Sequence, residues 1–269
     1  RGNFQRAGGW SMEKRSIQVN KTVLTGLMTA LVILATSLKI PIINGYIHLG
    51  DGFVFLSAII LGPFYGAFAA GVGSMAADIL GGFAQWALPT LLIKSSMAML
   101  LGLISRQKTK KQAYISAGAT VVIWTAFFIT IKNALINAVK FSAEGLAQAM
   151  DDTAENIVQK AAGIQWKLSA AILIFLMIVF LLLVWLIKKQ SSAGFSPKMV
   201  LGMMSAGACM IIGYYLAEVL IYGNPVSPAF SVPMNLFQFI VGIVITAAIS
   251  PALSRRDTRG QGHRFLGSN

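Results

Sequence analysis

Long apolar runs constrain this chain more than any other feature of its sequence. We find eight of them: Thr22 to Ile40, Phe53 to about Phe68, Ala69 to Gly82, Leu88 to Ile104, Ala113 to Ile131, Leu168 to Ile187, Met199 to Tyr222 and Met234 to Leu253. A helix that crosses a bilayer needs about 20 apolar residues, so these runs predict about eight membrane spans. Hydrophobic residues make up 56% of the chain and charged residues 12%, against about 45–50% and about 25% in soluble domains. This composition excludes a soluble enzyme, a disordered chain and a fibrous protein, and predicts an all-α, polytopic membrane helical bundle.

The basic residues lie mainly between the apolar runs. There are 22 lysines and arginines, and the net charge is +13. With a cytoplasmic N-terminus and eight spans, the clusters that fall on the cytoplasmic side are Lys14-Arg15, Arg106 to Lys111, Lys188-Lys189 and Arg255 to Arg264. Basic loops favour that side of a membrane. We therefore expect a multi-pass protein of the cell membrane, with both termini in the cytoplasm and no nucleic-acid partner.

The two ends of the chain are polar. The sequence begins with Arg1 rather than Met, and residues 1–11 lack the apolar core of a signal peptide. We expect Met12 to be the native start, with the preceding residues a tag or upstream translation. Residues 1–21 are then a cytoplasmic segment and residues 255–269 a basic cytoplasmic tail.

A long polar stretch from Ala134 to Lys167 separates the fifth and sixth runs. It holds four of the nine acidic residues, Glu144, Asp151, Asp152 and Glu155. The spacing of Leu146, Met150 and Ile157 is typical of a short amphipathic helix. The predicted topology places this stretch outside the cell, either as a solvated cap that joins two spans or as a docking or gating element.

Ionisable and strongly polar side chains inside the apolar runs or at their ends are costly in a bilayer, so each is a candidate functional residue. Seven residues are candidates for substrate binding: His48, Asp51, Lys94, Tyr214, Glu218, Asn235 and Gln238. The predicted topology places them all in the outer half of the membrane, together with Asp78. A channel or a proton relay needs polar groups through the full depth. The one-sided placement therefore predicts a pocket that opens to the outside.

Structural roles are the alternatives for these residues. Asp51 could be the N-cap of the second span. Lys94 could extend its ammonium outward along its long stem, or pair with Asp78 or Glu218. The aromatic residues at the same level could form an interfacial belt or stack on a flat ligand; they are Tyr46, Trp86, Tyr214, Tyr215, Tyr222 and Phe237.

Catalytic and metal-binding motifs are absent from the sequence. There is no Gly-x-x-x-x-Gly-Lys-Ser/Thr loop for ATP, no His-Glu-x-x-His and no Gly-x-Ser-x-Gly. The single cysteine, Cys209, excludes an internal disulfide and a cysteine-rich metal site. We therefore expect no enzyme, no metal and no cofactor. The alternatives are a self-contained secondary transporter and, less favoured, an intramembrane lipid-modifying enzyme that uses Asp78 and Glu218.

Six short motifs occur in a characteristic order along the chain. They are Tyr46-Ile-His-Leu-Gly-Asp51, Leu61-Gly-Pro-Phe-Tyr-Gly66, Gly73 to Asp78, Pro89-Thr-Leu-Leu-Ile-Lys94, Gly213-Tyr-Tyr-Leu-Ala-Glu218 and Asn235-Leu-Phe-Gln238. In their order and spacing the chain resembles the substrate-binding S components of energy-coupling factor (ECF) transporters, specifically the riboflavin-transporter-like family. The resemblance covers residues 22–104 and 198–253.

The resemblance implies a six-helix core that captures a small water-soluble vitamin or precursor near the outer surface. Pyridoxine or hydroxymethylpyrimidine is our first expectation for the ligand, and a flavin the second. It also implies partners: a transmembrane coupling (T) component and two ATPase subunits. In the family, small residues of the first helix pack on the T component, and Gly26 and Ala30 stand at those positions. The resemblance implies a ligand pocket at positions that match six of the candidates: His48, Asp51, Lys94, Glu218, Asn235 and Gln238.

The chain departs from that pattern by two extra spans. We expect core helices 1–4 in residues 22–104, an inserted helical hairpin with the acidic external segment in residues 105–197, and core helices 5–6 in residues 198–254. An insertion of two spans preserves the orientation of the helices that follow.

Overall fold

The structure is a computed structural model, and it describes residues 4–42, 45–149, 151–163, 165–167, 169–170, 174, 177, 196–223 and 227–257. Its helices are α1 (Phe4–Ser37), α2 (Gly50–Leu61), α3 (Pro63–Leu80), α4 (Ala84–Ser105), α5 (Lys110–Ala149), α7 (Pro197–Tyr222) and α8 (Val232–Asp257), with a short 3-10 helix η1 (Ser227–Phe230). Five helices in this described part are long and apolar enough to cross a membrane. The prediction of an all-α polytopic membrane bundle is therefore confirmed.

A small β-hairpin follows α1 and was not predicted. Strands β1 (Lys39–Ile42) and β2 (Gly45–His48) pair antiparallel, with Lys39 opposite His48. The first apolar run was expected to stay helical to Ile40, but α1 ends at Ser37. The residue before a proline disfavours the helical conformation, so Pro41 directs Ile40 into an extended strand. The hairpin brings His48 back to the end of α1.

The second and third runs meet at Gly62, and the expected boundary between Phe68 and Ala69 was wrong. Gly62 has φ 90° and ψ −177°, a conformation that is essentially restricted to glycine. Pro63 then opens α3 at a first-turn position, where its missing N–H is not needed. The Arg106 guanidinium donates to the carbonyls of Ala58 (3.2 Å) and Ile59 (3.4 Å). It thereby satisfies carbonyl groups at the end of α2.

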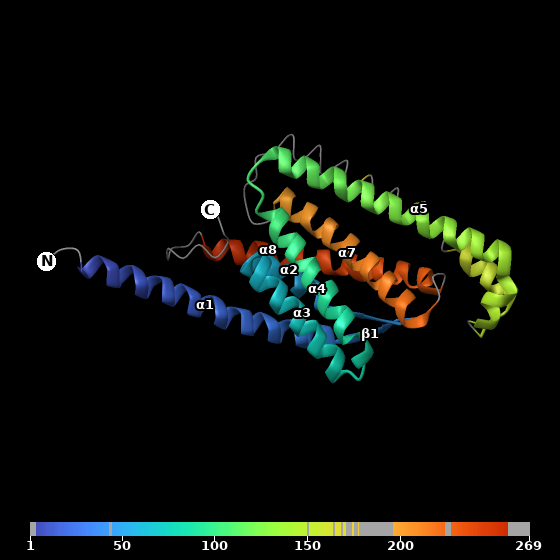
Figure 1. Cartoon of the computed structure of the whole chain (residues 1–269), viewed down its shortest axis with the longest axis horizontal. Coiled ribbons are helices and arrows are strands. Elements are labelled where there is room, and N and C mark those ends of the chain that lie inside the picture. Colours follow the sequence, from blue (N-terminus) through green and yellow to red (C-terminus); the bar gives the residue numbers. More distant parts are fainter. Residues whose placement is uncertain are drawn as a thin grey trace.

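Helices α2, α3, α4 and α7 form the centre of the bundle, with α1 against α3 and α2, and α8 against α2 (Figure 1). Close approach depends on small residues, as is usual in membrane bundles. A Cβ added at Gly102 of α4 would lie 2.6 Å from the Pro63 Cα of α3. The largest buried apolar side chains at these interfaces are Phe55, Met97, Leu101, Met203 and Met210.

Helix α5 lies along the opposite side of the bundle from α1 (Figure 1). Its main neighbour is α7. The Trp124 side chain is 1% exposed, and its indole N–H donates to the Met204 carbonyl at 3.0 Å. The Thr120 and Ser205 hydroxyls are 2.6 Å apart. The helix was expected to end at Ile131 but continues to Ala149.

The part of the acidic stretch that follows α5 turns back toward the end of that helix. Residues 154–163 are helical, and Ile157, 0% exposed, packs against Ala147. Asp152 accepts hydrogen bonds from the Thr153 N–H (2.8 Å) and the Asn156 amide (2.9 Å) and pairs with Lys160. These donors lower the pKa of Asp152 to about 2. Most of the run from Leu168 to Ile187, and the tail beyond residue 257, lie outside the described residues.

Candidate functional site

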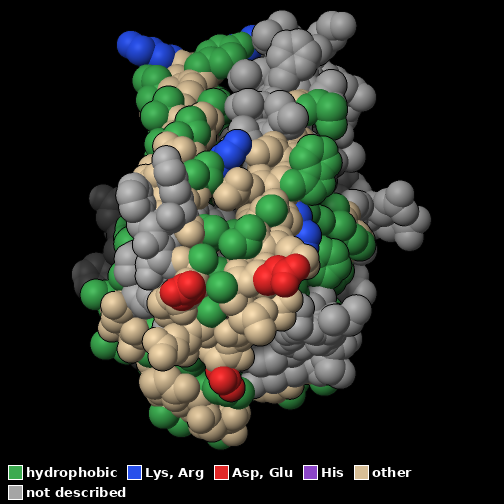
Figure 2. Space-filling view, turned by 90° about the vertical axis from the view of Figure 1, so that its right-hand side faces the viewer, with side chains coloured by type: hydrophobic (Ala, Val, Ile, Leu, Met, Phe, Trp, Pro, Cys, Tyr) green, Lys and Arg blue, Asp and Glu red, His purple; other side chains and the backbone are tan. Residues whose placement is uncertain are grey.

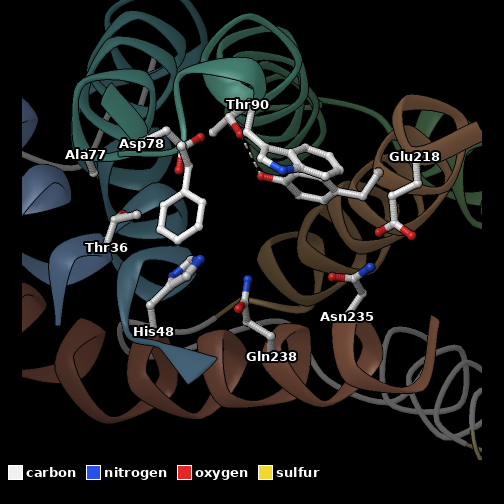
Figure 3. A pocket seen from close by; sticks show the side chains of 11 residues that line it. Thr36, His48, Ala77, Asp78, Thr90, Glu218, Asn235 and Gln238 are labelled. Atoms are coloured by element: carbon white, nitrogen blue, oxygen red, sulfur yellow. Dashed lines mark hydrogen bonds between the residues drawn. The ribbon is translucent and has the colours of Figure 1, made fainter. Parts of the chain in front are cut away.

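A cavity of about 190 Å³ opens at one end of the bundle. Here the β-hairpin, the turn between α3 and α4, and the connection from α7 to α8 come together. The lining residues are Thr36, His48, Ala77, Asp78, Phe83, Trp86, Thr90, Tyr214, Glu218, Asn235 and Gln238 (Figure 3). Figure 2 shows this end of the molecule in space-filling form. The acidic side chains in view are separated from one another.

Aromatic rings form one wall of the cavity. The ring centroids of Trp86 and Tyr214 are 6.2 Å apart, and the ring of Tyr222, which is not among the lining residues, lies 6.4 Å from that of Trp86. The Tyr214 hydroxyl is 3.3 Å from the Thr90 hydroxyl, which fixes the phenol ring against α4. Phe83 adds a further ring from the turn between α3 and α4. The wall offers flat faces on which a ring ligand could stack.

Asp51 and Lys94 form an ion pair directly behind the lining. Both side chains are 1% exposed. The Gln238 amide N–H donates to the second carboxylate oxygen of Asp51 at 2.9 Å. The Lys94 ammonium also lies 5.2 Å from the centroid of the Tyr214 ring and 3.5 Å from the Met210 sulfur. The pair joins α2 to α4 and, through Gln238, to α8.

This ion pair excludes several structural roles that the sequence had left open for Asp51 and Lys94. Leu49, not Asp51, is the N-cap of α2, so Asp51 does not have the capping role. Lys94 does not extend outward, because its side chain is buried, and its salt-bridge partner is Asp51 rather than Asp78 or Glu218.

Hydrogen bonds to protein groups fix the orientation of two polar side chains of the lining. Because Asp51 accepts the Gln238 N–H, the Gln238 carbonyl oxygen is the atom left to accept a hydrogen bond from a ligand. The Nδ1 atom of His48 accepts the Gly50 N–H at 3.2 Å. The proton of the neutral imidazole is therefore on Nε2.

Two further groups give the cavity its polar character. The Ser231 hydroxyl, at the start of α8, donates to Glu218 at 2.7 Å and so ties the end of α7 to α8. The Thr36 side chain is 5% exposed. Its hydroxyl oxygen has no hydrogen-bond partner within the described part of the chain. A buried hydroxyl of this kind usually has a partner, so a ligand or a water molecule is expected there.

Five of the seven predicted site residues line the cavity: His48, Tyr214, Glu218, Asn235 and Gln238. Asp51 and Lys94 lie behind it. Sequence reasoning missed Thr36, Ala77, Phe83 and Thr90. Ala77 and Thr90 stand inside two of the quoted motifs, but Thr36 carries no signal that separates it from other small helical residues. The role of all these residues toward a ligand stays a prediction.

The remaining sequence candidates lie away from the cavity. Gly26 and Ala30 are on an exposed face of α1, and a Cβ added at Gly26 would have no atom within 4 Å. Tyr215 packs on Phe127 of α5, with ring centroids 5.7 Å apart. The side chain of Tyr46 falls outside the described residues. In the described part of the chain no three His, Cys, Asp or Glu side chains are grouped so as to hold a metal ion.

Comparison with known proteins gives one family and one curated relative. Residues 16–189 match the family described as "ECF-type riboflavin transporter, S component". A protein of Pyrococcus woesei, described as "Uncharacterized protein in gap 3'region", is 42% identical over 72 residues, which are 27% of this chain and 48% of that protein. The chain thus spans about half the length of that relative. No solved structure matches the chain significantly.

Proposed function

Because the chain belongs to the ECF-type riboflavin transporter S component family, we propose that it is the substrate-capture subunit of an ECF importer. Its substrate in this proposal is a small water-soluble vitamin or precursor, held in the cavity between α3, α4, α7 and α8. The family is one of transport components and not of enzymes. The observation that carries the proposal is the cavity itself, which combines neighbouring aromatic rings with convergent polar groups at one end of a membrane bundle.

The orientation of the molecule follows from its charges. Helix α4 carries Trp86 and Thr90 to the cavity and ends, about 30 Å away at 1.5 Å per residue, in the basic cluster that begins at Arg106. Basic loops favour the cytoplasm. The cavity therefore opens to the outside, and the N- and C-termini are cytoplasmic.

The size of the cavity favours a ligand with one ring. Pockets for drug-sized molecules measure about 300–1,000 Å³, and this one measures about 190 Å³. Pyridoxine or a hydroxymethylpyrimidine fits that size better than the three fused rings of a flavin. A flavin remains the second candidate because the family description names riboflavin.

The proposed partners are a transmembrane T component and two ATPase subunits. They supply the ATP hydrolysis for which this sequence has no motif. The surface that we assign to the T component is the face of α1 around Gly26 and Ala30. It lies on the opposite side of the bundle from α5, so the inserted helix leaves it open (Figure 1). The division into a six-helix core and an inserted hairpin belongs to the same proposal.

The test is identification of the bound molecule. The protein is purified in mild detergent and denatured, and the released small molecules are identified by mass spectrometry. We expect a stoichiometric vitamin or precursor that is lost from Glu218→Ala but retained by Glu144→Ala, a change at an exposed acid on α5. An empty protein whose melting temperature no vitamin raises would contradict the proposal. Accumulation of a labelled vitamin in cells that lack the partner subunits would favour a self-contained carrier instead.

A further inference from the structure

The side-chain amide of Gln238 lines the cavity in one fixed orientation. Its N–H group donates to the Oδ2 atom of Asp51 at 2.9 Å. The other oxygen of that carboxylate pairs with the Lys94 ammonium. As the carboxylate of an ion pair, Asp51 accepts hydrogen bonds and donates none. A turned amide would bring the Gln238 carbonyl oxygen against a carboxylate oxygen with no hydrogen between them, so the carbonyl oxygen is directed away from Asp51.

Close packing of α2 on α8 prevents Asp51 from moving away from Gln238. The Asp51 side chain is 0% exposed. Gly242 follows Gln238 by one turn of α8, and a Cβ added there would lie 2.9 Å from the Asp51 Cβ. A Cβ added at Gly52 would lie 2.5 Å from the Ile245 side chain. The two glycines let the backbones approach, so the carboxylate meets the Gln238 amide directly. In the described part of the chain, no residue donates a hydrogen bond to the Gln238 carbonyl oxygen.

We propose, on the basis of the function proposed above, that Asp51 is a positioning residue that sets the specificity of the cavity. Through Gln238 it fixes a hydrogen-bond acceptor at the lining, so the substrate is a ring with a hydroxyl or N–H donor at its edge. A ligand that offers only an acceptor at that edge would displace water from the carbonyl oxygen and leave it without a partner, which weakens binding. Sites that hydrogen-bond an O–H or N–H group discriminate strongly against analogues that lack it.

Glu218 places a second acceptor on the same side of the cavity. In Figure 3, Gln238, Asn235 and Glu218 lie next to one another along one side. One oxygen of Glu218 accepts the Ser231 hydroxyl at 2.7 Å, and a carboxylate has lone pairs for further donors. A ring whose edge meets both Gln238 and Glu218 therefore presents two donors. The class of substrate is a heterocycle with hydroxyl or amino substituents.

The experiment compares probes in which one donor at a time is methylated. Pyridoxine is compared with its 3-O-methyl, 4′-O-methyl and 5′-O-methyl ethers. The compound 4-amino-5-hydroxymethyl-2-methylpyrimidine is compared with its methyl ether and its N-methylamino derivative, and riboflavin with 3-methylriboflavin. Binding to the full chain in detergent is measured by titration calorimetry. We expect the derivative that is blocked at the donor facing Gln238 to bind at least about tenfold more weakly than the unmodified probe.

Two variants separate this preference from the added bulk of a methyl group. In Asp51→Asn combined with Lys94→Met, an amide replaces the carboxylate and offers a partner to either orientation of Gln238. Discrimination against the blocked derivative should then fall to about threefold or less. Gln238→Met removes the acceptor and should lower the affinity of the unmodified probe to that of the derivative, which keeps the test informative if the double variant fails to fold. Gln85→Met, at an exposed residue next to Trp86 that is not in the lining, should change neither.

The results distinguish this inference from the proposed function. If an unmodified probe binds and all its methylated derivatives bind within about threefold of it, the inference is overturned and the capture function stands. A derivative that the original protein, the double variant and Gln238→Met all disfavour equally is excluded by its bulk, which also overturns the inference. Binding of no unmodified probe and no derivative contradicts the capture function and the inference together.

Discussion

The Asp51 and Lys94 side chains show how a bundle in a membrane accommodates charge. Each is buried, and each would be costly alone, but together they form a neutral unit that also accepts the Gln238 amide. Removal of one member of a buried pair costs about 3–5 kcal/mol, because the other charge is left uncompensated, whereas replacement of both can be close to neutral. The pair is therefore better regarded as a positioning device for Gln238 than as a source of stability.

Lys94→Met should lower the melting temperature strongly, because Asp51 is left buried without its counter-ion. Combining it with Asp51→Asn should restore most of the loss. The measurement is thermal unfolding in detergent, followed by tryptophan fluorescence, with the exposed Lys108→Met as the control. A double variant no more stable than Lys94→Met would show that the charges are not coupled.

The sequence indicated which polar residues to consider but not how they pair. Because ionisable and strongly polar side chains are rare in and beside apolar runs, His48, Glu218, Asn235 and Gln238 could be selected from the sequence alone. The partner of Lys94 depends on how α2 and α4 cross, and no local pattern contains that information. Thr36 was missed because a threonine in an apolar helix is unremarkable until its hydroxyl is seen to be buried without a partner.

Among the elements, α2 and α3 show that hydropathy does not locate the boundary between two apolar helices. Both are apolar, so hydropathy placed their boundary near Phe68 instead of at Gly62. The turn chemistry of Gly62-Pro63 did mark the break, since glycine allows the required φ and proline opens the next helix. The long α5 was underestimated for a related reason. Its last turns are polar, but helix formation continues through residues with good helix propensity.

Gly62→Ala should destabilise the protein by about 1–3 kcal/mol, because alanine resists the backbone conformation at this position. An added Cβ would also come within 3.2 Å of the Arg106 guanidinium. Gly118→Ala is the matched control, since that glycine is within α5 and has open space around it. Equal melting temperatures for the two variants would contradict the assigned role of Gly62.

Trp124→Phe tests whether α5 belongs to the packed bundle. The change removes the hydrogen bond to the Met204 carbonyl and part of a buried ring. A loss of about 1–3 kcal/mol is expected. Trp166 is 73% exposed, so Trp166→Phe should leave thermal unfolding unchanged. If both variants unfold like the parent protein, α5 does not contribute to the stability of the core.

For the whole molecule, the separation of the cavity from the exposed face of α1 predicts that capture and uptake can be uncoupled. Gly26→Leu should abolish ATP-dependent uptake in cells that contain the partner subunits, because a bulky side chain blocks close helix approach. Vitamin binding by the purified protein should be unchanged. Gly118→Leu, at an equally open glycine on α5, is the control. Normal uptake by Gly26→Leu would place the partner on another surface.

The proposed topology has a direct test. In a Cys209→Ala background, a single cysteine at Lys108 should be protected from a membrane-impermeant maleimide in intact cells. A single cysteine at Asp151, in the acidic turn after α5, should react. Labelling at Lys108 but not at Asp151 would invert the molecule and place the cavity on the cytoplasmic side.

The length of α2 bears on how the chain is made. Twelve residues span about 18 Å, well short of a hydrocarbon core of about 30 Å. The segment also carries Asp51, whose counter-ion is encoded 43 positions later in α4. The lateral exit of α2 from the translocon into lipid is thus unfavourable on its own. We expect α2 and α3 to remain near the translocon until α4 has been synthesised, and truncation of the nascent chain before Lys94 to leave this part of the protein poorly inserted and open to degradation.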